Sequence, residues 1–243
     1  MLVPSMTNEE ITKAVIRDFR KIEQSHLKRL HEDYHKERKR LKIEKRNTWS
    51  KEYAVQLPLS KTEWKIVMQK NPCQPRYKDM EDATGSPYTS YFGPQGLRVF
   101  RPYENSIEVF NGHFFTRYNE RINLNLHHQT DVIQRFFFKN SYMLPETMKH
   151  NGKEYIMSVC KDGAALGQYH DETPYRWLVH NTFITTQQMH KSQAEGQFER
   201  MSDSLKSITD AMVKANPNNK EGITETMLFE QSQRILLNML ARA

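Results

Sequence analysis

Hydrophobic residues recur every three to five positions near the start of the chain, which is the spacing of one face of an α-helix. Residues 8–46 contain neither Pro nor Gly, and Thr7 and Asn8 belong to the residue types that cap helix starts. We therefore expect a long helical arm within a first segment, residues 1–50. Its apolar face needs a partner and consists of Ile11, Val15, Phe19, Ile22, Leu27, Leu30 and Tyr34.

Pro and Gly become frequent between Asn71 and Gly96, which indicates irregular chain. We therefore expect residues 51–96 to form an irregular connector. Aromatic residues are interleaved there or close by, namely Tyr77, Tyr88, Tyr91, Phe92 and Phe100. These rings either stack on the bases of a nucleic acid or, as is more common in a proline-rich loop, fix the loop to the core.

The third segment, residues 97–186, has the pattern of an α+β core. Short apolar runs predict strands on either side of a turn near Pro102, and Lys161-Asp162-Gly163 is a hairpin turn signal. Strands are expected at residues 97–100, 106–110, 154–160, 164–170 and 175–185, and helices after Asn111 and from Thr130 onward.

The last segment, residues 187–243, is expected to form a pair of helices. Two stretches with one apolar side, residues 186–215 and 222–243, are separated by a loop at residues 216–219. The predicted fold is α+β: a small antiparallel sheet with a packed helix that bears His and Arg, flanked by long N-terminal and C-terminal helices that form a helical bundle.

The composition of the chain indicates its cellular location but says little about its function. The 243 residues carry a formal charge of +7, a modest bias toward anionic partners. Cys73 and Cys160 lie far apart without a paired motif, so we expect neither a disulfide framework nor a zinc knuckle, and we expect a cytoplasmic location. The sequence has no apolar signal core and no run long enough to span a membrane, although export by a specialised apparatus stays open.

The most informative motif is the helix that follows Asn111. At about 100° per residue, His113, Arg117 and Arg121 fall within about 80° of arc, and Glu120 lies about 20° from His113. Asn111 is a plausible N-cap, so His113 is expected in the first turn. There the helix dipole and the neighbouring arginines favour an uncharged imidazole.

An uncharged imidazole between two guanidinium groups fits metal-independent cleavage of RNA. His113 would accept the proton of a ribose 2′-hydroxyl, Arg117 and Arg121 would hold the phosphate, and Glu120 would orient an arginine or carry a second proton. On the last strand, two-residue alternation groups Arg176 and Leu178 with His180 and Thr182. His180 is then the candidate general acid, and Thr182 a hydroxyl donor to the phosphate.

Other interpretations explain the same residues with fewer assumptions. Arginines four residues apart on a helix edge usually make surface ion pairs, and a lone histidine near a helix start is usually structural. A non-enzymatic protein would bind nucleic acid or an acidic protein through the basic end of the arm, with Arg176 as a further nucleic-acid contact. A solvated helix end with internal Glu-Lys and Glu-Arg pairs is the more common explanation of such a run. The basic candidates in the arm are Arg38, Lys39, Arg40 and Lys42.

Metal chemistry has less support, so no metal or cofactor is expected. His127 and His128 are adjacent, and adjacent side chains diverge on a helix and on a strand alike. Acidic and histidine side chains near one end of the expected hairpin are the remaining possible ligands, namely Asp162, His170, Asp171 and Glu172.

A helix carrying His-x3-Arg-x3-Arg, followed by antiparallel strands of which the last bears a Thr, resembles the metal-independent ribonuclease superfold of barnase, colicin-type and RelE-like toxins. The resemblance covers about residues 97–186. It implies His113 as base or acid, Arg117 and Arg121 as phosphate clamp, and Thr182 as an auxiliary polar group. The helical arm and the C-terminal helices depart from small free-standing toxins, which leaves room for an immunity, regulatory or delivery surface. The partners expected are RNA, a cognate inhibitor or partner protein, and a second copy of the chain bound through the helices.

Overall fold

The structure is a computed structural model, and it describes residues 2–43, 50–58, 60–70, 83–103, 106–140, 143–150, 153–172 and 175–188. The chain divides into two compact units, residues 1–71 with 81–183 and residues 72–80 with 184–243. Among the described residues, the first unit contains the α-helices and the sheet, apart from residues 184 and 185 at the end of the last strand. The predicted C-terminal helical pair lies outside the described residues, apart from the short 3₁₀ turn Thr186–Gln188.

A mixed nine-stranded sheet forms the centre of the first unit, in the order β1-β2-β3-β4-β5-β9-β8-β7-β6. Its strands are β1 Ser50–Gln56, β2 Glu63–Lys70, β3 Ala83–Gly93, β4 Gly96–Tyr103, β5 Ser106–Asn111, β6 Leu144–His150, β7 Lys153–Cys160, β8 Gly163–Glu172 and β9 Tyr175–Thr185. The strands from β1 to β5 pair antiparallel in sequence order, whereas β5 and β9 pair in parallel, with Phe110 opposite His180.

The predicted small antiparallel sheet is therefore wrong. Residues 51–96, expected to be an irregular connector, supply β1, β2 and β3. The Pro and Gly density was misleading because Pro87 lies within β3, opposite Ile66 of β2. In β2, Trp64, Ile66 and Met68 belong to one core and Val67 to the other, so this strand is buried on both faces.

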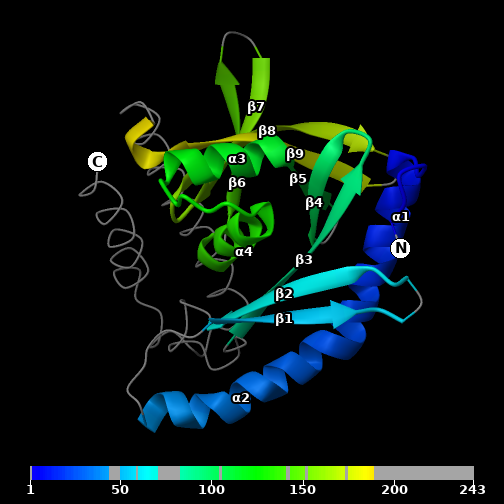
Figure 1. Cartoon of the computed structure of the whole chain (residues 1–243), viewed down its shortest axis with the longest axis vertical. Coiled ribbons are helices and arrows are strands. Elements are labelled where there is room, and N and C mark those ends of the chain that lie inside the picture. The colour runs from blue at the N-terminus through cyan, green and yellow to red at the C-terminus, as the bar shows by residue number, and fades with distance from the viewer. Residues whose placement is uncertain are drawn as a thin grey trace, which may run out of the picture. The chain divides into compact units, whose positions relative to one another are not determined.

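One face of the sheet is covered by the N-terminal helices: α1 Asn8–Ile22, a π-helical turn at Glu23–Leu27 and α2 Lys28–Ile43 (Figure 1). The capping box at Thr7 starts α1, because the Thr7 hydroxyl accepts from Glu10 N and the Glu10 carboxylate accepts from Thr7 N. The buried side chains of these helices belong to the predicted apolar face and pack against the sheet. They include Ile11, Val15, Ile22, Leu30 and Tyr34, which meet Trp64, Ile66, Phe100 and Trp177.

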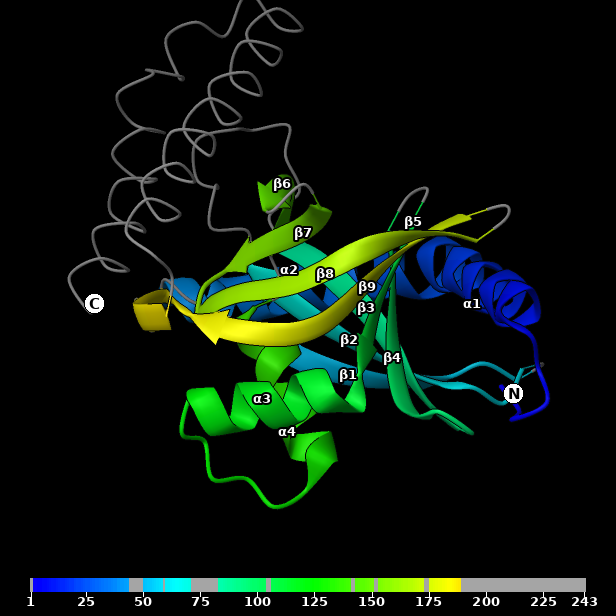
Figure 2. The ribbon, with the colours of Figure 1, turned by 90° about the horizontal axis from the view of Figure 1, so that it is seen from above.

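The opposite face is covered by α3 Gly112–Arg121 and α4 Gln129–Lys139, which lie side by side (Figures 1 and 2). An aromatic core joins them to the sheet. Its fully buried rings are Phe110, Phe114, Phe115, Tyr118, Phe136, Phe137 and Phe183. Several of these pairs meet edge to face, for example Tyr118 with Phe183, whose ring centroids lie 4.9 Å apart.

The helices of the first unit therefore pack on the sheet, and the predicted bundle of N-terminal and C-terminal helices is wrong as a fold. The apolar stripe of α1 and α2 was identified correctly, but its partner is β2, β4 and β9. The strand predictions after Leu97 fare better. The two strands around the turn near Pro102, the hairpin at Lys161-Asp162-Gly163 and the last strand from Tyr175 to Thr185 are all present.

Candidate functional site

The helix α3 begins as its sequence predicts. The Asn111 side chain accepts a hydrogen bond from Phe114 N at 2.8 Å, which satisfies one of the free N–H groups at the helix start. His113 therefore lies in the first turn, and its side chain is exposed. The other side of α3 packs in the aromatic core through Phe114, Phe115 and Tyr118.

Three of the predicted residues gather on the exposed edge of α3. The Nε–H of Arg117 donates to His113 Nε2 at 3.4 Å, and a terminal nitrogen of Arg117 donates to Glu120 Oε2 at 3.0 Å. About half of each side chain of the Arg117–Glu120 pair is exposed, so this ion pair adds little stability. The lone pair of His113 Nε2 faces the guanidinium, which leaves Nδ1 as the nitrogen that carries a proton in the neutral ring.

Arg121 does not join this group. Its guanidinium donates to the backbone carbonyl oxygen of Phe183, so it fastens the end of α3 to β9. Arg121 therefore occupies a structural position, and the predicted clamp of two arginines around one phosphate is not assembled in this structure.

His180 lies in the core, which corrects its predicted role as general acid. The side chain has no exposed surface and stacks on Phe110, with 4.5 Å between ring centroids. Its Nε2 atom lies 3.5 Å from Glu108 Oε1 without the alignment of a hydrogen bond, and neither ring nitrogen has a hydrogen-bond partner among the described residues. A group buried in this way cannot protonate a leaving oxygen in a bound substrate.

The buried charges beside His180 are internally compensated. Arg101 and Glu108, on the paired strands β4 and β5, form an ion pair in which both side chains are almost completely buried. Burial alone would raise the pKa of Glu108, but the positive charge of Arg101 lowers it to about 2. Burial lowers the pKa of His180 by more than the nearby carboxylate raises it, so the ring is neutral.

The remaining candidates are scattered. Thr182 is half-buried near the end of β9. The expected two-residue alternation is broken there, because His180 and Phe183 both contact the ring of Phe114. Arg176 is exposed, and its guanidinium lies 4.5 Å from the centroid of Tyr169. The side chains of the basic candidates Arg38, Lys39, Arg40 and Lys42 lie outside the described part of α2.

The alternative metal ligands do not form a site in the described part of the chain, where no cluster of three His, Cys, Asp or Glu side chains occurs. Asp162 instead accepts from Tyr118 Oη at 2.6 Å and from Asn140 Nδ2 at 3.1 Å. This network ties α3, the end of α4 and the β7–β8 turn together. Burial and the Asp162 carboxylate raise the pKa of Tyr118, so the phenol keeps its proton.

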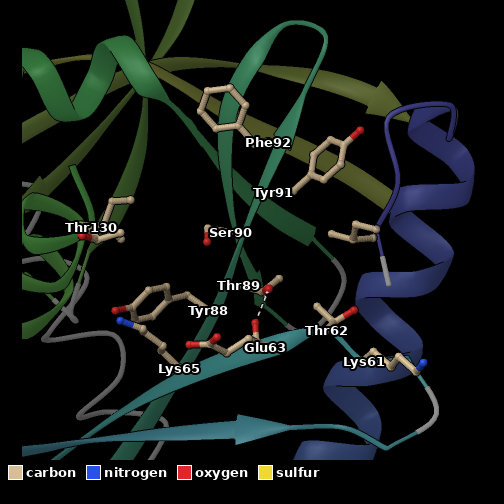
Figure 3. Close-up of a pocket in the computed structure, with 12 residues that line it drawn as sticks. Lys61, Thr62, Glu63, Lys65, Tyr88, Thr89, Ser90, Tyr91, Phe92 and Thr130 are labelled. Atoms are coloured by element: carbon tan, nitrogen blue, oxygen red, sulfur yellow. Dashed lines mark hydrogen bonds between the residues drawn. The ribbon is translucent and has the colours of Figure 1, made fainter. Parts of the chain in front are cut away.

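A pocket that the sequence did not predict opens beside β3, with a volume of about 410 Å³. It lies where β2 begins, next to the loop that precedes Glu63 and the first turn of α4 (Figure 3). Figure 3 shows Tyr88, Ser90 and Phe92 on the side of β3 toward Thr130, with Glu63 and Lys65 on the neighbouring strand. None of the six residues predicted for catalysis lines this pocket.

Part of the pocket lining is fixed by internal contacts. Glu52 of β1 accepts from Tyr88 Oη at 2.8 Å and from Gln134 of α4 at 3.1 Å, and its carboxylate lies 3.6 Å from Lys65 Nζ. Tyr88 also stacks on Phe137, with 4.2 Å between ring centroids. These contacts hold the floor of the pocket rigid and compensate the charge of Lys65.

Other side chains that line the pocket are exposed, namely Phe92, Ser90 and Lys61. The Phe92 side chain is 72% exposed, although it is a large apolar ring. The hydroxyl of Ser90 and the ammonium of Lys61 have no hydrogen-bond or ion-pair partner among the described residues, and both side chains are exposed. Sequence reasoning recognised Phe92 as a possible stacking ring but could not place it on the same pocket as Lys61, because the pairing of β2 with β3 was not foreseen.

Comparisons with known proteins add no assignment: no family model, curated protein or solved structure matches this chain. The resemblance to metal-independent ribonucleases therefore stays a prediction. Among the described helices, none combines the length and apolar character required to cross a membrane.

Proposed function

We propose that this protein binds single-stranded nucleic acid, with RNA as the first candidate, through the pocket beside β3. The observation that carries the proposal is the Phe92 ring, which is 72% exposed at a pocket of nucleotide size. Base stacking on an exposed aromatic side chain is the common means by which proteins hold unpaired bases, because every base has a flat π face.

The surroundings of Phe92 support this use. Among the described residues, the other large rings are buried or half-buried, apart from Tyr169, which is 39% exposed. Lys61 contributes a positive charge without an ion-pair partner in the described part of the chain, and Ser90 and Thr130 contribute exposed hydroxyls. A ring for the base, a cation for the phosphate and hydroxyls for polar edges form a small nucleotide site.

The direct test is fluorescence anisotropy of a short labelled RNA with the native protein and with Phe92→Ala. Stacking is worth about 1–3 kcal/mol per base, so we expect the dissociation constant to rise about 10-fold or more. Phe92→Trp should retain binding. Tyr169→Ala, which removes the other exposed ring of the described residues, is the matched control and should bind as the native protein does. Equal affinity of Phe92→Ala and native protein would contradict the proposal.

A second candidate function, cleavage of RNA, is favoured by one contact. The imidazole of His113 lies beside the guanidinium of Arg117, and it can act as a base on a 2′-hydroxyl when its Nε2 lone pair exchanges the contact with Arg117 for the hydroxyl. His180 is not available as the acid in such a reaction, since it is buried. The second candidate therefore rests on His113 and Arg117 alone.

Cleavage is tested by incubating purified protein and His113→Ala with labelled RNA in EDTA. Cleavage by the native protein and its loss in the variant would support the second candidate. Equal cleavage by both proteins, or none by either, would remove it without affecting the binding proposal. The cytoplasmic location, the inhibitor or partner protein and the homo-oligomer stay predictions.

A further inference from the structure

The start of α3 lies next to the pocket, although its residues are far from the pocket in sequence. Gln129, the first residue of α4, donates from its side chain to the carbonyl oxygen of Gly112 at 3.0 Å. Thr130, the next residue, lines the pocket. Gly112 also approaches Leu97, which pairs with Phe92 across the β3–β4 hairpin.

Exposed and half-buried residues therefore connect the pocket with the edge of α3. Phe92 and Thr130 lie at the pocket, Gln129 and Gly112 follow, and His113 is the next exposed side chain along α3. Arg117 comes one helical turn later, about 6 Å further along the axis. A strand that leaves the pocket on this side meets His113 and then Arg117.

We infer that His113 and Arg117 form a second subsite, which binds a phosphate of the same strand beyond the nucleotide held in the pocket. This inference rests on the proposed function, because it requires a strand in the pocket. The pair keeps donors that no described contact uses. Of the five guanidinium N–H groups of Arg117, one donates to His113 and one to Glu120, so three remain. His113 adds the N–H of Nδ1, since its Nε2 accepts from Arg117.

The charges around this subsite define what it binds. Arg117 carries the positive charge, and Glu120, which faces the same guanidinium, carries a negative charge that a bound phosphate must displace or tolerate. A guanidinium presents a fork that matches phosphate oxygens. The subsite therefore contributes to strands of more than one nucleotide and contributes nothing to a ligand that fills the pocket alone.

The test measures affinity against strand length by calorimetry or by competition anisotropy. The probes are uridine monophosphate and the uridine di-, tetra- and octanucleotides, and the proteins are native, Phe92→Ala and Arg117→Gln. We expect Phe92→Ala to weaken binding of every probe. We expect Arg117→Gln to leave the mononucleotide unchanged and to weaken the octanucleotide about 10-fold.

Arg17→Gln is the matched control, because Arg17 is an exposed arginine of α1, which packs on the other face of the sheet. It should behave as the native protein at every length, and circular dichroism should show that all variants fold. If Arg117→Gln weakens every probe equally, or weakens none while Phe92→Ala still does, the second subsite is wrong and the proposed function stands. If no probe binds the native protein, both are wrong.

Discussion

Lys61 has a backbone conformation that lysine rarely adopts. Its φ of +51° lies in the left-handed region, where a Cβ atom is crowded by the backbone. The β1–β2 loop holds it there, because its N–H donates to the Leu57 carbonyl at 2.9 Å. A residue kept in a costly conformation at a pocket suggests that its side chain is needed there.

Lys61→Gly should therefore stabilise the fold and weaken binding. Glycine adopts the left-handed region without crowding, so we expect the free energy of unfolding to rise by about 1 kcal/mol in urea denaturation. RNA affinity should fall several-fold because a phosphate contact is lost. Asn123→Gly, at a φ of +55° in the α3–α4 loop, is the control that should leave affinity unchanged. Unchanged affinity in Lys61→Gly would show that its ammonium has no part in binding.

The buried polar residues predict how acid destabilises the protein. The pKa of His180 is lowered on folding, so the unfolded chain takes up the proton that the folded chain refuses, and stability should fall as the pH drops below about 6.5. The pKa of Glu108 is also lowered, from 4.5 to about 2, so further stability should be lost across that range.

The measurement is the urea midpoint as a function of pH. His180→Asn should remove the part of the loss that begins near pH 6.5, whatever the variant costs at neutral pH, and should leave the lower step in place. A stability profile that is flat between about pH 7.5 and pH 5 in the native protein would contradict the burial of a neutral His180.

Among the elements, α3 depends on its cap. The Asn111 side chain accepts from Phe114 N at 2.8 Å and its amide also donates to Asn181 of β9 at 3.2 Å. Asn111→Ala should lower the free energy of unfolding by about 1 kcal/mol in urea denaturation, whereas Asn111→Ser, which retains a cap oxygen, should lose less. An equal loss in both variants would mean that the contact with β9, and not the cap, holds α3.

Elements specified by local signals were predictable from the sequence. The capping residues Thr7 and Asn111, the turn at Lys161-Asp162-Gly163 and the alternation of β9 as far as His180 each act within a few residues. The strand β3 was missed because Pro and Gly were taken as signals of irregular chain, and β1 and β2 were missed because that interpretation was extended to residues 51–70, which contain only Pro58 and no Gly. In β3 the proline lies where the strand pairs with β2 alone, since the pairing of β3 with β4 covers only Thr89 to Gly93.

At the scale of the molecule, the sheet could not be derived from local pattern. The parallel pairing of β5 with β9 joins residues about 70 positions apart, and it is this pairing that buries His180 beside Glu108 and Phe110. For β9, the predicted bounds of the strand were therefore correct, whereas the predicted role of His180 was wrong. Helical spacing correctly brought His113, Arg117 and Glu120 together, but it could not reveal that Arg121 binds β9.

The net charge of +7 is large enough for binding by a broad basic surface, and the salt dependence of the affinity distinguishes such binding from binding at the pocket. If binding uses phosphate contacts from Lys61 and Arg117 only, the logarithm of the affinity should fall with the logarithm of salt concentration with a slope of about −1.4, at about 0.7 per contact. Anisotropy titrations at several salt concentrations measure it. A much steeper slope would indicate binding by a broad basic surface in place of the pocket.

The most direct test of the central claim is the affinity of a short single-stranded RNA for the native protein, Phe92→Ala and Tyr169→Ala, measured side by side on proteins shown to be folded. The account predicts a loss of about 10-fold or more for Phe92→Ala alone. Equal affinity in all three, or the same loss in both variants, would contradict it.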